Sequence, residues 1–308
     1  MAYNVTALTD YTNEQNFPIL KASILGAKTA SLFQLQTGIK SSAALNLMDV
    51  DVILQNDAIG SDVAGGGDVK FSQRNISVTP IAVREFFDPK VLNQKYLQSQ
   101  MKAGSADNEI VFEQEIVDAV TEKVAAKMET ALWKGDVTLT GNTDLKHFDG
   151  YIKLIDAAGT GVTVTTAATF TSANAIASVD ALYAAIPVEV LDAEDMAIYM
   201  GRDYYRTYTT ALKNANLFHY SADSTAEGEI TVPGTTIKIY ALNGLNTSKR
   251  VVAGRKSNFW IGTDLEGEED NASTVYIDAI EKVKMKIAFK YGAQIAFPAE
   301  VTVLKVTA

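Results

Sequence analysis

The stretch from Asp107 to Lys134 constrains the fold more than any other, because apolar residues recur there at every fourth position. The repeat consists of Phe112, Ile116, Val120, Val124, Met128 and Leu132, and Val117 and Ala131 widen it. The remaining faces carry Asp118, Glu122, Lys123, Lys127 and Glu129. This period predicts one amphipathic helix, about 40 Å long at roughly 1.5 Å per residue. Ser105 or Asp107 can cap its start, and Gly135 stands where helices commonly end.

Two β-prone runs precede this helix and predict a hairpin with a flexible tip. The first run, residues 47–54, alternates apolar and polar side chains, and the second covers residues 69–87. Gly65, Gly66 and Gly67 lie between the runs and permit positive φ angles at the connection. A two-stranded ribbon with few apolar residues has no core of its own, so we expect it to lie on another surface. An ordinary surface hairpin is the simpler alternative.

The region after the helix predicts a compact domain of mixed structure. Residues 174–186 have a helical apolar face, residues 197–203 read as a strand that runs into a turn, and residues 204–218 form a second helical pattern. A hairpin at Pro233 and Gly234 and the strand of residues 251–254 follow. Four tyrosines fall in this region, and we expect them at an interface or a domain surface rather than around a ligand. They are Tyr199, Tyr204, Tyr205 and Tyr208.

Near the C-terminus, residues 281–290 alternate almost perfectly and predict a strand with two different faces. Val283, Met285, Ile287 and Phe289 form one face, and Lys282, Lys284, Lys286 and Lys290 form the other. We expect the lysines on a solvent face, where they protect a long strand from edge-to-edge aggregation. Two alternatives stay open. One is DNA binding, although that face has no interleaved Arg or aromatic residue. The other is pairing between subunits with the acidic run of Glu266, Glu268, Glu269 and Asp270.

The composition allows a sizeable core and argues against several classes of protein. The 308 residues are 47% hydrophobic and 21% charged. The net charge of −10 argues against a protein whose main task is to grip nucleic acid, since that affinity rests on Lys and Arg. The absence of cysteine excludes disulfides and thiolate chemistry. Without a signal peptide or a long apolar run, we expect neither secretion nor membrane insertion.

No motif for catalysis, a cofactor or a metal stands out. His147 and His219 are far apart in the sequence, and the acidic run lacks the spacing of a calcium-binding loop. Gly159 and Gly161 are too few for a dinucleotide fingerprint. We therefore expect no catalytic residue, no metal and no cofactor.

Two short motifs and the order of the segments resemble tailed-phage major capsid proteins, which share the Hong Kong ninety-seven fold. Phe148, Asp149 and Gly150 follow the long helix, and the run of residues 262–265, Gly-Thr-Asp-Leu, precedes the acidic run and the final strands. The resemblance implies an α+β capsid fold with an inserted axial α/β domain. The implied parts are an N-terminal arm (1–46), an extended hairpin loop (47–88), a peripheral domain with a spine helix and a β-sheet (89–150), the axial domain (151–268), and closing strands that return to the peripheral domain (269–308).

The same resemblance implies a structural function. The chain would assemble as pentamers and hexamers into an icosahedral shell around double-stranded DNA, which it would contact weakly and without sequence specificity. The hairpin tip, with Gly65, Gly66, Gly67 and Lys70, would reach across a neighbouring subunit, and the acidic run would form a second contact. A separate scaffolding protein, a portal and capsid accessory proteins are implied partners. The implied location is the virion capsid, assembled in the host cytoplasm.

Two alternatives differ from this interpretation. An encapsulin-like shell shares the fold but encloses proteins instead of DNA. The other alternative is a mixed-fold enzyme in which scattered carboxylates converge in space. The sequence contains no acid–base, metal or nucleophile motif that favours it.

Overall fold

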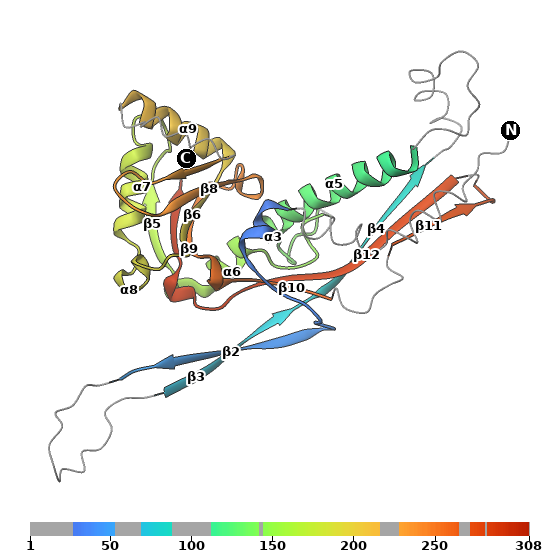
Figure 1. The fold of residues 1–308 in the computed structure, drawn as a ribbon, viewed down its shortest axis with the longest axis horizontal. Coiled ribbons are helices and arrows are strands. Elements are labelled where there is room, and N and C mark those ends of the chain that lie inside the picture. The colour runs from blue at the N-terminus through green and yellow to red at the C-terminus, as the bar shows by residue number, and fades with distance from the viewer. Residues whose placement is uncertain are drawn as a thin grey trace, which may run out of the picture.

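The protein combines two β-sheets, a long helix and a two-stranded ribbon that projects from the body (Figure 1). The computed structural model describes residues 27–52, 69–87, 112–141, 144–215, 228–264, 272–280 and 282–307. None of the helices within these ranges is both long enough and apolar enough to cross a bilayer.

A five-stranded sheet and the helix α5 (Phe112–Lys134) form one elongated layer pair. The strands follow the order β1-β10-β12-β11, with β4 on the other edge of β12; they are β1 (Gln34–Gln36), β10 (Phe259–Thr263), β12 (Lys282–Ile295), β11 (Ala272–Ile277) and β4 (Thr79–Phe87). The helix runs along the sheet (Figure 1). Val124, Met128 and Leu132 of α5 are buried, as the fourfold repeat predicted. Phe289 of β12 belongs to the same core. The helix prediction is thus confirmed from Phe112 to Lys134, directly before Gly135, and the candidate N-caps Ser105 and Asp107 lie outside the described residues.

The second sheet has six strands and helices packed on it. Its order is β5-β13-β9-β6-β8-β7, from β5 (Thr163–Ala167), β13 (Thr302–Val306), β9 (Arg250–Arg255), β6 (Met196–Gly201), β8 (Lys238–Leu242) and β7 (Glu229–Thr231). The helices are α7 (Ala175–Ala184), α8 (Val188–Leu191) and α9 (Arg202–Asn214). The predicted hairpin is present, because β7 and β8 pair antiparallel around a turn in which Gly234 has a φ of 79°.

The two closing strands separate into different sheets, which corrects the expectation that residues 269–308 return together to the peripheral domain. β12 lies in the five-stranded sheet, whereas β13 pairs with β5 and β9 in the six-stranded sheet. A 3-10 turn at Pro298–Glu300 separates them. Pattern alone predicts that a segment is a strand but not which sheet it joins, because two buried edges of similar apolar character accept it equally well.

The position of β12 also corrects the role predicted for its lysines. β12 pairs with β4 on one side and with β10 and β11 on the other, so it has no free edge to protect. The alternation itself is confirmed, because Val283, Met285, Ile287 and Phe289 are all buried. Protection of a strand edge therefore does not explain the row of lysines.

An aromatic cluster joins the two sheets and corrects the extent of the predicted arm. Phe33 follows α3 (Lys28–Leu32) and stacks on Phe259 with ring centroids 4.7 Å apart. Trp133, Tyr151 and Tyr199 surround Phe33, with centroid distances of 6.0, 5.4 and 5.2 Å. Residues 27–36 are therefore part of the core rather than of an extended arm, because Phe33 forms many aromatic contacts there. Residues 1–26 lie outside the described ranges.

A buried carboxylate fastens α5 to two other segments. Sequence periodicity placed Glu129 on a polar face, but its side chain is buried. Its oxygens accept hydrogen bonds from the backbone N–H of Lys28 at 2.9 Å, Asn243 at 2.9 Å and Gly244 at 3.4 Å. Periodicity cannot anticipate this position, because the carboxylate is buried to satisfy donors from residues more than a hundred positions away.

The tyrosine prediction is half right. Tyr199 and Tyr208 are buried in the core, whereas Tyr204 and Tyr205 are partly exposed beside it. The first two tyrosines come from β6 and the inward side of α9, where an apolar ring fills the core.

Candidate inter-subunit surface

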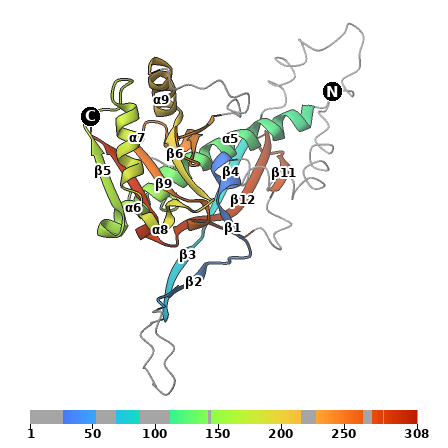
Figure 2. The same ribbon diagram turned by 60° about the vertical axis from the view of Figure 1, so that its left-hand side comes forward.

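The projecting ribbon is the feature of the described chain that most needs a partner. Strands β2 (Ser42–Val50) and β3 (Val69–Ser77) pair antiparallel with each other and with none of the other described strands. Both views show them pointing away from the body (Figures 1 and 2). At roughly 3.4 Å per residue, nine-residue strands extend about 30 Å. The hairpin thus begins at Ser42, five residues before the predicted start, and the run beyond Ser77 does not belong to it, because β4 pairs with β12.

One face of the ribbon is exposed along its whole length and becomes apolar at its distal end. Met48 lies opposite Phe71 in the register, and Val50 lies opposite Val69. Phe71 is 77% exposed and Met48 is 61% exposed. We call Met48, Val50, Val69 and Phe71 the ribbon patch. Contact with another surface would remove these two cross-strand pairs of apolar side chains from water, which lowers the free energy.

The opposite face packs on the protein's own body at the root of the ribbon. A small core of Ile39, Leu45, Ile76 and Val78 is buried there, with Trp260 packed against it. Two glycines that face each other in the β10–β12 register, Gly262 and Gly292, leave room for this crossing. A Cβ atom on Gly262 would lie 2.9 Å from Ile76 Cδ1, and one on Gly292 would overlap the carbonyl oxygen of Ser77. The sheet therefore has no side chain at this pair of positions, which lets β3 approach it closely.

Polar contacts fix the angle of the root. Arg74 Nη1 donates to the carbonyl oxygen of Ile295 at 2.7 Å, and Gln294 Nε2 donates to that of Asn75 at 2.7 Å. Each contact joins the ribbon to the end of β12. A charged donor on a backbone carbonyl is a strong hydrogen bond, so the ribbon leaves the sheet in a defined direction.

A buried carboxylate holds the segment that enters the ribbon. Asp264, whose side chain is 0% exposed, forms ion pairs with Lys40 at 3.0 Å and Lys290 at 2.8 Å. Burial opposes ionisation, but the hydrogen bonds and charges of Lys290 and Lys40 outweigh it and lower the pKa of Asp264. The backbone N–H of Ile39 also donates to the carbonyl oxygen of Thr263 at 3.2 Å. The Gly-Thr-Asp motif thus anchors the ribbon.

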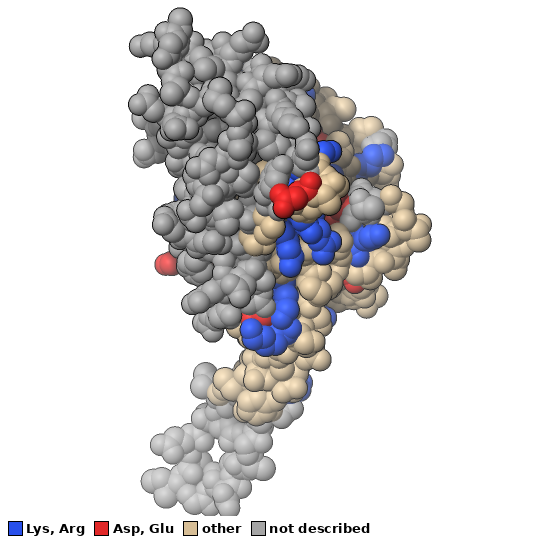
Figure 3. Space-filling view, turned by 90° about the vertical axis from the view of Figure 1, so that its right-hand side faces the viewer, with Lys and Arg blue, Asp and Glu red and all other residues tan. Residues whose placement is uncertain are grey.

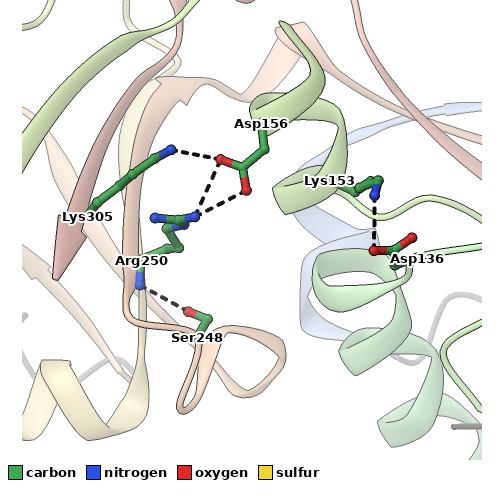
Figure 4. A network of polar contacts seen from close by, with 6 residues as sticks. All are labelled: Asp136, Lys153, Asp156, Ser248, Arg250 and Lys305. Atoms are coloured by element: carbon green, nitrogen blue, oxygen red, sulfur yellow. Dashed lines mark hydrogen bonds and ion pairs between the residues drawn. The ribbon is translucent and has the colours of Figure 1, made fainter. Parts of the chain in front are cut away.

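A second polar network fixes the six-stranded sheet to the rest of the molecule (Figure 4). Asp156 of α6 (Tyr151–Ala158) accepts from Arg250 Nη2 at 3.1 Å and Lys305 Nζ at 2.9 Å, so one carboxylate joins α6 to β9 and β13. On the same helix, Lys153 pairs with Asp136 at 3.1 Å, just beyond the end of α5. These pairs are partly exposed and add orientation more than stability.

A groove of about 570 Å³ lies between α5 and β4. Its walls are mainly apolar, with Val83, Val120 and Phe289 among them, and Lys127 and Asp144 form an ion pair of 3.3 Å at its rim. The lining includes no serine, threonine or cysteine that could act as a nucleophile. Within the described ranges no three His, Asp or Glu side chains come close enough together to hold a metal ion.

The residues predicted for contacts are only partly within the described ranges. Gly65, Gly66 and Gly67 and the acidic run of Glu266, Glu268, Glu269 and Asp270 lie outside them. Lys70 is exposed on β3 opposite Asp49, on the ribbon face that does not carry the patch. The ribbon patch was not identified from the sequence, because only the strand register shows that its four residues lie side by side. The spacing of Val69 and Phe71 by two residues was the available signal.

Comparison with solved structures finds the fold of phage capsids. A chain of "Satellite phage P4 procapsid including size determination (Sid) protein" is 10% identical, with 99% of this chain and 91% of that chain covered and a TM-score of 0.61. A chain of Mycobacterium phage Ogopogo is 12% identical, with 91% and 92% covered and a TM-score of 0.60. A virus-like particle from Pyrococcus furiosus is 12% identical, with 93% and 96% covered and a TM-score of 0.52.

No protein-family model and no curated protein matches the sequence. The fold is nevertheless matched over nearly the whole chain, so the α+β capsid fold implied by the sequence resemblance is confirmed.

Proposed function

We propose that this protein is the major capsid subunit of a tailed phage, and that its function is to assemble into a closed shell. The observation that carries the proposal is the ribbon patch, because Phe71 and Met48 are held in water at the end of a rigidly rooted ribbon. A catalytic protein gains nothing from such an extension, whereas a shell subunit uses it to overlap a neighbour. The match of fold to phage capsids over the full chain supports the same function.

Assembly follows from many weak contacts of this kind. A contact between identical subunits that passes head to tail closes into rings, here pentamers and hexamers of an icosahedral shell. Each contact is modest, and the shell becomes stable because every subunit gives a ribbon and receives one. The ribbon tip with Gly65, Gly66, Gly67 and Lys70 would reach furthest over the neighbour.

The remaining parts of the proposal concern organisation and partners. Residues 151–268 would form the axial domain around the ring centres, and the sheet with α5 would form the peripheral domain. Scaffolding, portal and accessory proteins would complete a virion capsid that assembles in the host cytoplasm. Packaged double-stranded DNA would be contacted weakly, consistent with the net charge of −10.

One alternative is a shell of the same fold that encloses protein cargo, and the fold is shared with a virus-like particle. The two shells differ in content rather than in subunit structure. Nuclease treatment of purified particles followed by extraction separates them, because only a DNA-filled capsid retains protected nucleic acid.

The direct test of the proposal is size-exclusion chromatography with light scattering, then negative-stain electron microscopy of the heaviest fraction. We expect rings or closed shells, formed by the chain alone or after addition of a crowding polymer. A species that stays monomeric at every concentration, with the crowding polymer and with a co-expressed scaffolding protein, would refute the function.

A further inference from the structure

The outer face of the five-stranded sheet carries a dense row of cations. On β12 the exposed or partly exposed positions alternate as Lys282, Lys284 and Lys286, and Arg84 of β4 lies directly opposite Lys286 in the register. Figure 3 views this end of the molecule and shows basic side chains gathered in a column, with few acidic ones among the described residues. The row is unexpected on a protein with a net charge of −10.

These four cations have no carboxylate partner within the described part of the chain. Lys290, four residues beyond Lys286 on the same face of β12, does have one, because it pairs with buried Asp264. Like charges that face each other across a strand pair are destabilising, and Lys286 and Arg84 do so on two paired strands. An isolated subunit tolerates this cost, and an anionic partner would remove it.

The face between the cations is apolar, which indicates the chemistry of the partner. Phe86 lies opposite Lys284 on one side and Val275 lies opposite it on the other, and both side chains are exposed. A partner with carboxylates and apolar contacts fits this mixture better than a phosphate backbone does. Lysines at alternate positions of a strand repeat every 6.6–6.8 Å or so, the spacing that carboxylates at alternate positions of an extended peptide also have.

We propose that this cationic face binds the acidic segment 266–270 of a second copy of the chain. Glu266, Glu268 and Asp270 occupy alternate positions of that segment, and Glu269 adds a fourth carboxylate. Three alternating carboxylates thus match three alternating lysines. The inference rests on the proposed shell function, because it names the surface with which the acidic segment pairs in the neighbouring subunit.

The attachment of the segment favours a second copy over the same chain. β10 ends at Thr263, opposite Tyr291, and β11 begins at Ala272, opposite Ile287. Both attachment points therefore lie toward one end of the row, and Lys282 is about 17 Å beyond Ile287 at roughly 3.4 Å per residue. In a second copy the same two ends are held on the neighbouring subunit, so its segment can be placed along the whole row.

Charge reversal tests the pairing on the full chain. One variant carries Lys284→Glu with Lys286→Glu, and the other carries Glu266→Lys with Glu268→Lys. We expect each variant alone to raise the threshold concentration for assembly by about tenfold or more, since like charges replace a complementary contact. Mixed in equal amounts, the two variants restore assembly, because the reversed face of one meets the reversed segment of the other.

Matched controls separate this contact from general charge effects. Lys213→Glu with Lys238→Glu makes the same charge change at two exposed lysines on the six-stranded-sheet side, and we expect the wild-type threshold for it. Urea unfolding of each variant below its threshold verifies that the fold is intact. The wild-type threshold also rises with salt, since ion pairs between exposed groups are screened.

Each outcome decides the inference. Wild-type shells together with unaffected reversal variants would overturn the pairing and leave the shell function standing. If the mixture fails to assemble and assembly returns only when all four reversals are in one chain, the contact lies within a single chain. That result would overturn the inference that the acidic segment comes from a second copy. Normal shells of the lysine variant that lose protected DNA would assign the face to nucleic acid. A wild-type chain that never assembles would overturn both the function and the inference.

Discussion

Replacing Phe71 with serine tests whether the ribbon patch is an assembly contact. Phe71 is 77% exposed in the subunit and lies opposite Met48. Complete burial of such a side chain contributes about 1.5–3 kcal/mol, so covering the exposed part contributes about 1–2 kcal/mol. Because each subunit gives one ribbon and receives one, the loss applies once per subunit. We expect Phe71→Ser to raise the threshold concentration for assembly about 5- to 30-fold.

The assay is light scattering over a concentration series, with urea unfolding of the unassembled subunit alongside. Because Phe71 lies outside every buried core cluster, its replacement changes the free energy of unfolding by only about 0.5 kcal/mol or less. Ser72→Ala on the other face of the same strand is the matched control and keeps the wild-type threshold. An unchanged threshold for Phe71→Ser, or an equal shift for the control, would refute the reasoning.

Three further predictions concern the supports of the ribbon and of α5. Glu129→Ala leaves three backbone N–H groups without their acceptor and lowers the free energy of unfolding by about 3–5 kcal/mol, whereas Glu129→Gln retains one acceptor oxygen and costs roughly half as much; equal urea midpoints for the two variants would contradict this. Gly292→Ala drives a methyl group into the Ser77 carbonyl and costs about 2 kcal/mol or more, while Gly141→Ala, which meets no atom within 4 Å, leaves the urea midpoint unchanged. The pKa of Asp264 is lowered in the folded protein, so its contribution is complete above the unfolded pKa of about 3.9 and disappears as the pH falls through the folded pKa. The stability difference between the wild type and Asp264→Asn should therefore be constant near neutral pH and shrink below about pH 4, and a difference that grows in acid would show that the carboxylate is not held in its charged form.

The local patterns of the sequence were sufficient to predict the main helices and strands. The fourfold repeat ending at Leu132 predicted α5, and the alternation from Val283 to Phe289 predicted the inner face of β12, because a single buried side leaves its period in the sequence. The order of these segments was specific enough to indicate the capsid fold. Turn residues such as Gly234 indicated the hairpin in the second sheet, since few residues adopt its positive φ.

The way in which these elements combine depends on contacts between distant parts of the chain. Three features depend on partners far away in the sequence. They are the place of β13 in the second sheet, the burial of Glu129 against backbone donors, and the packing of Phe33 into the aromatic cluster between the sheets. The ribbon patch likewise exists only once the register places Met48 opposite Phe71. Periodicity records which side of an element is buried, but it contains no information on the identity of the surface that buries it. That identity is set by packing between elements, and in this protein it determines which surfaces remain for a neighbouring subunit.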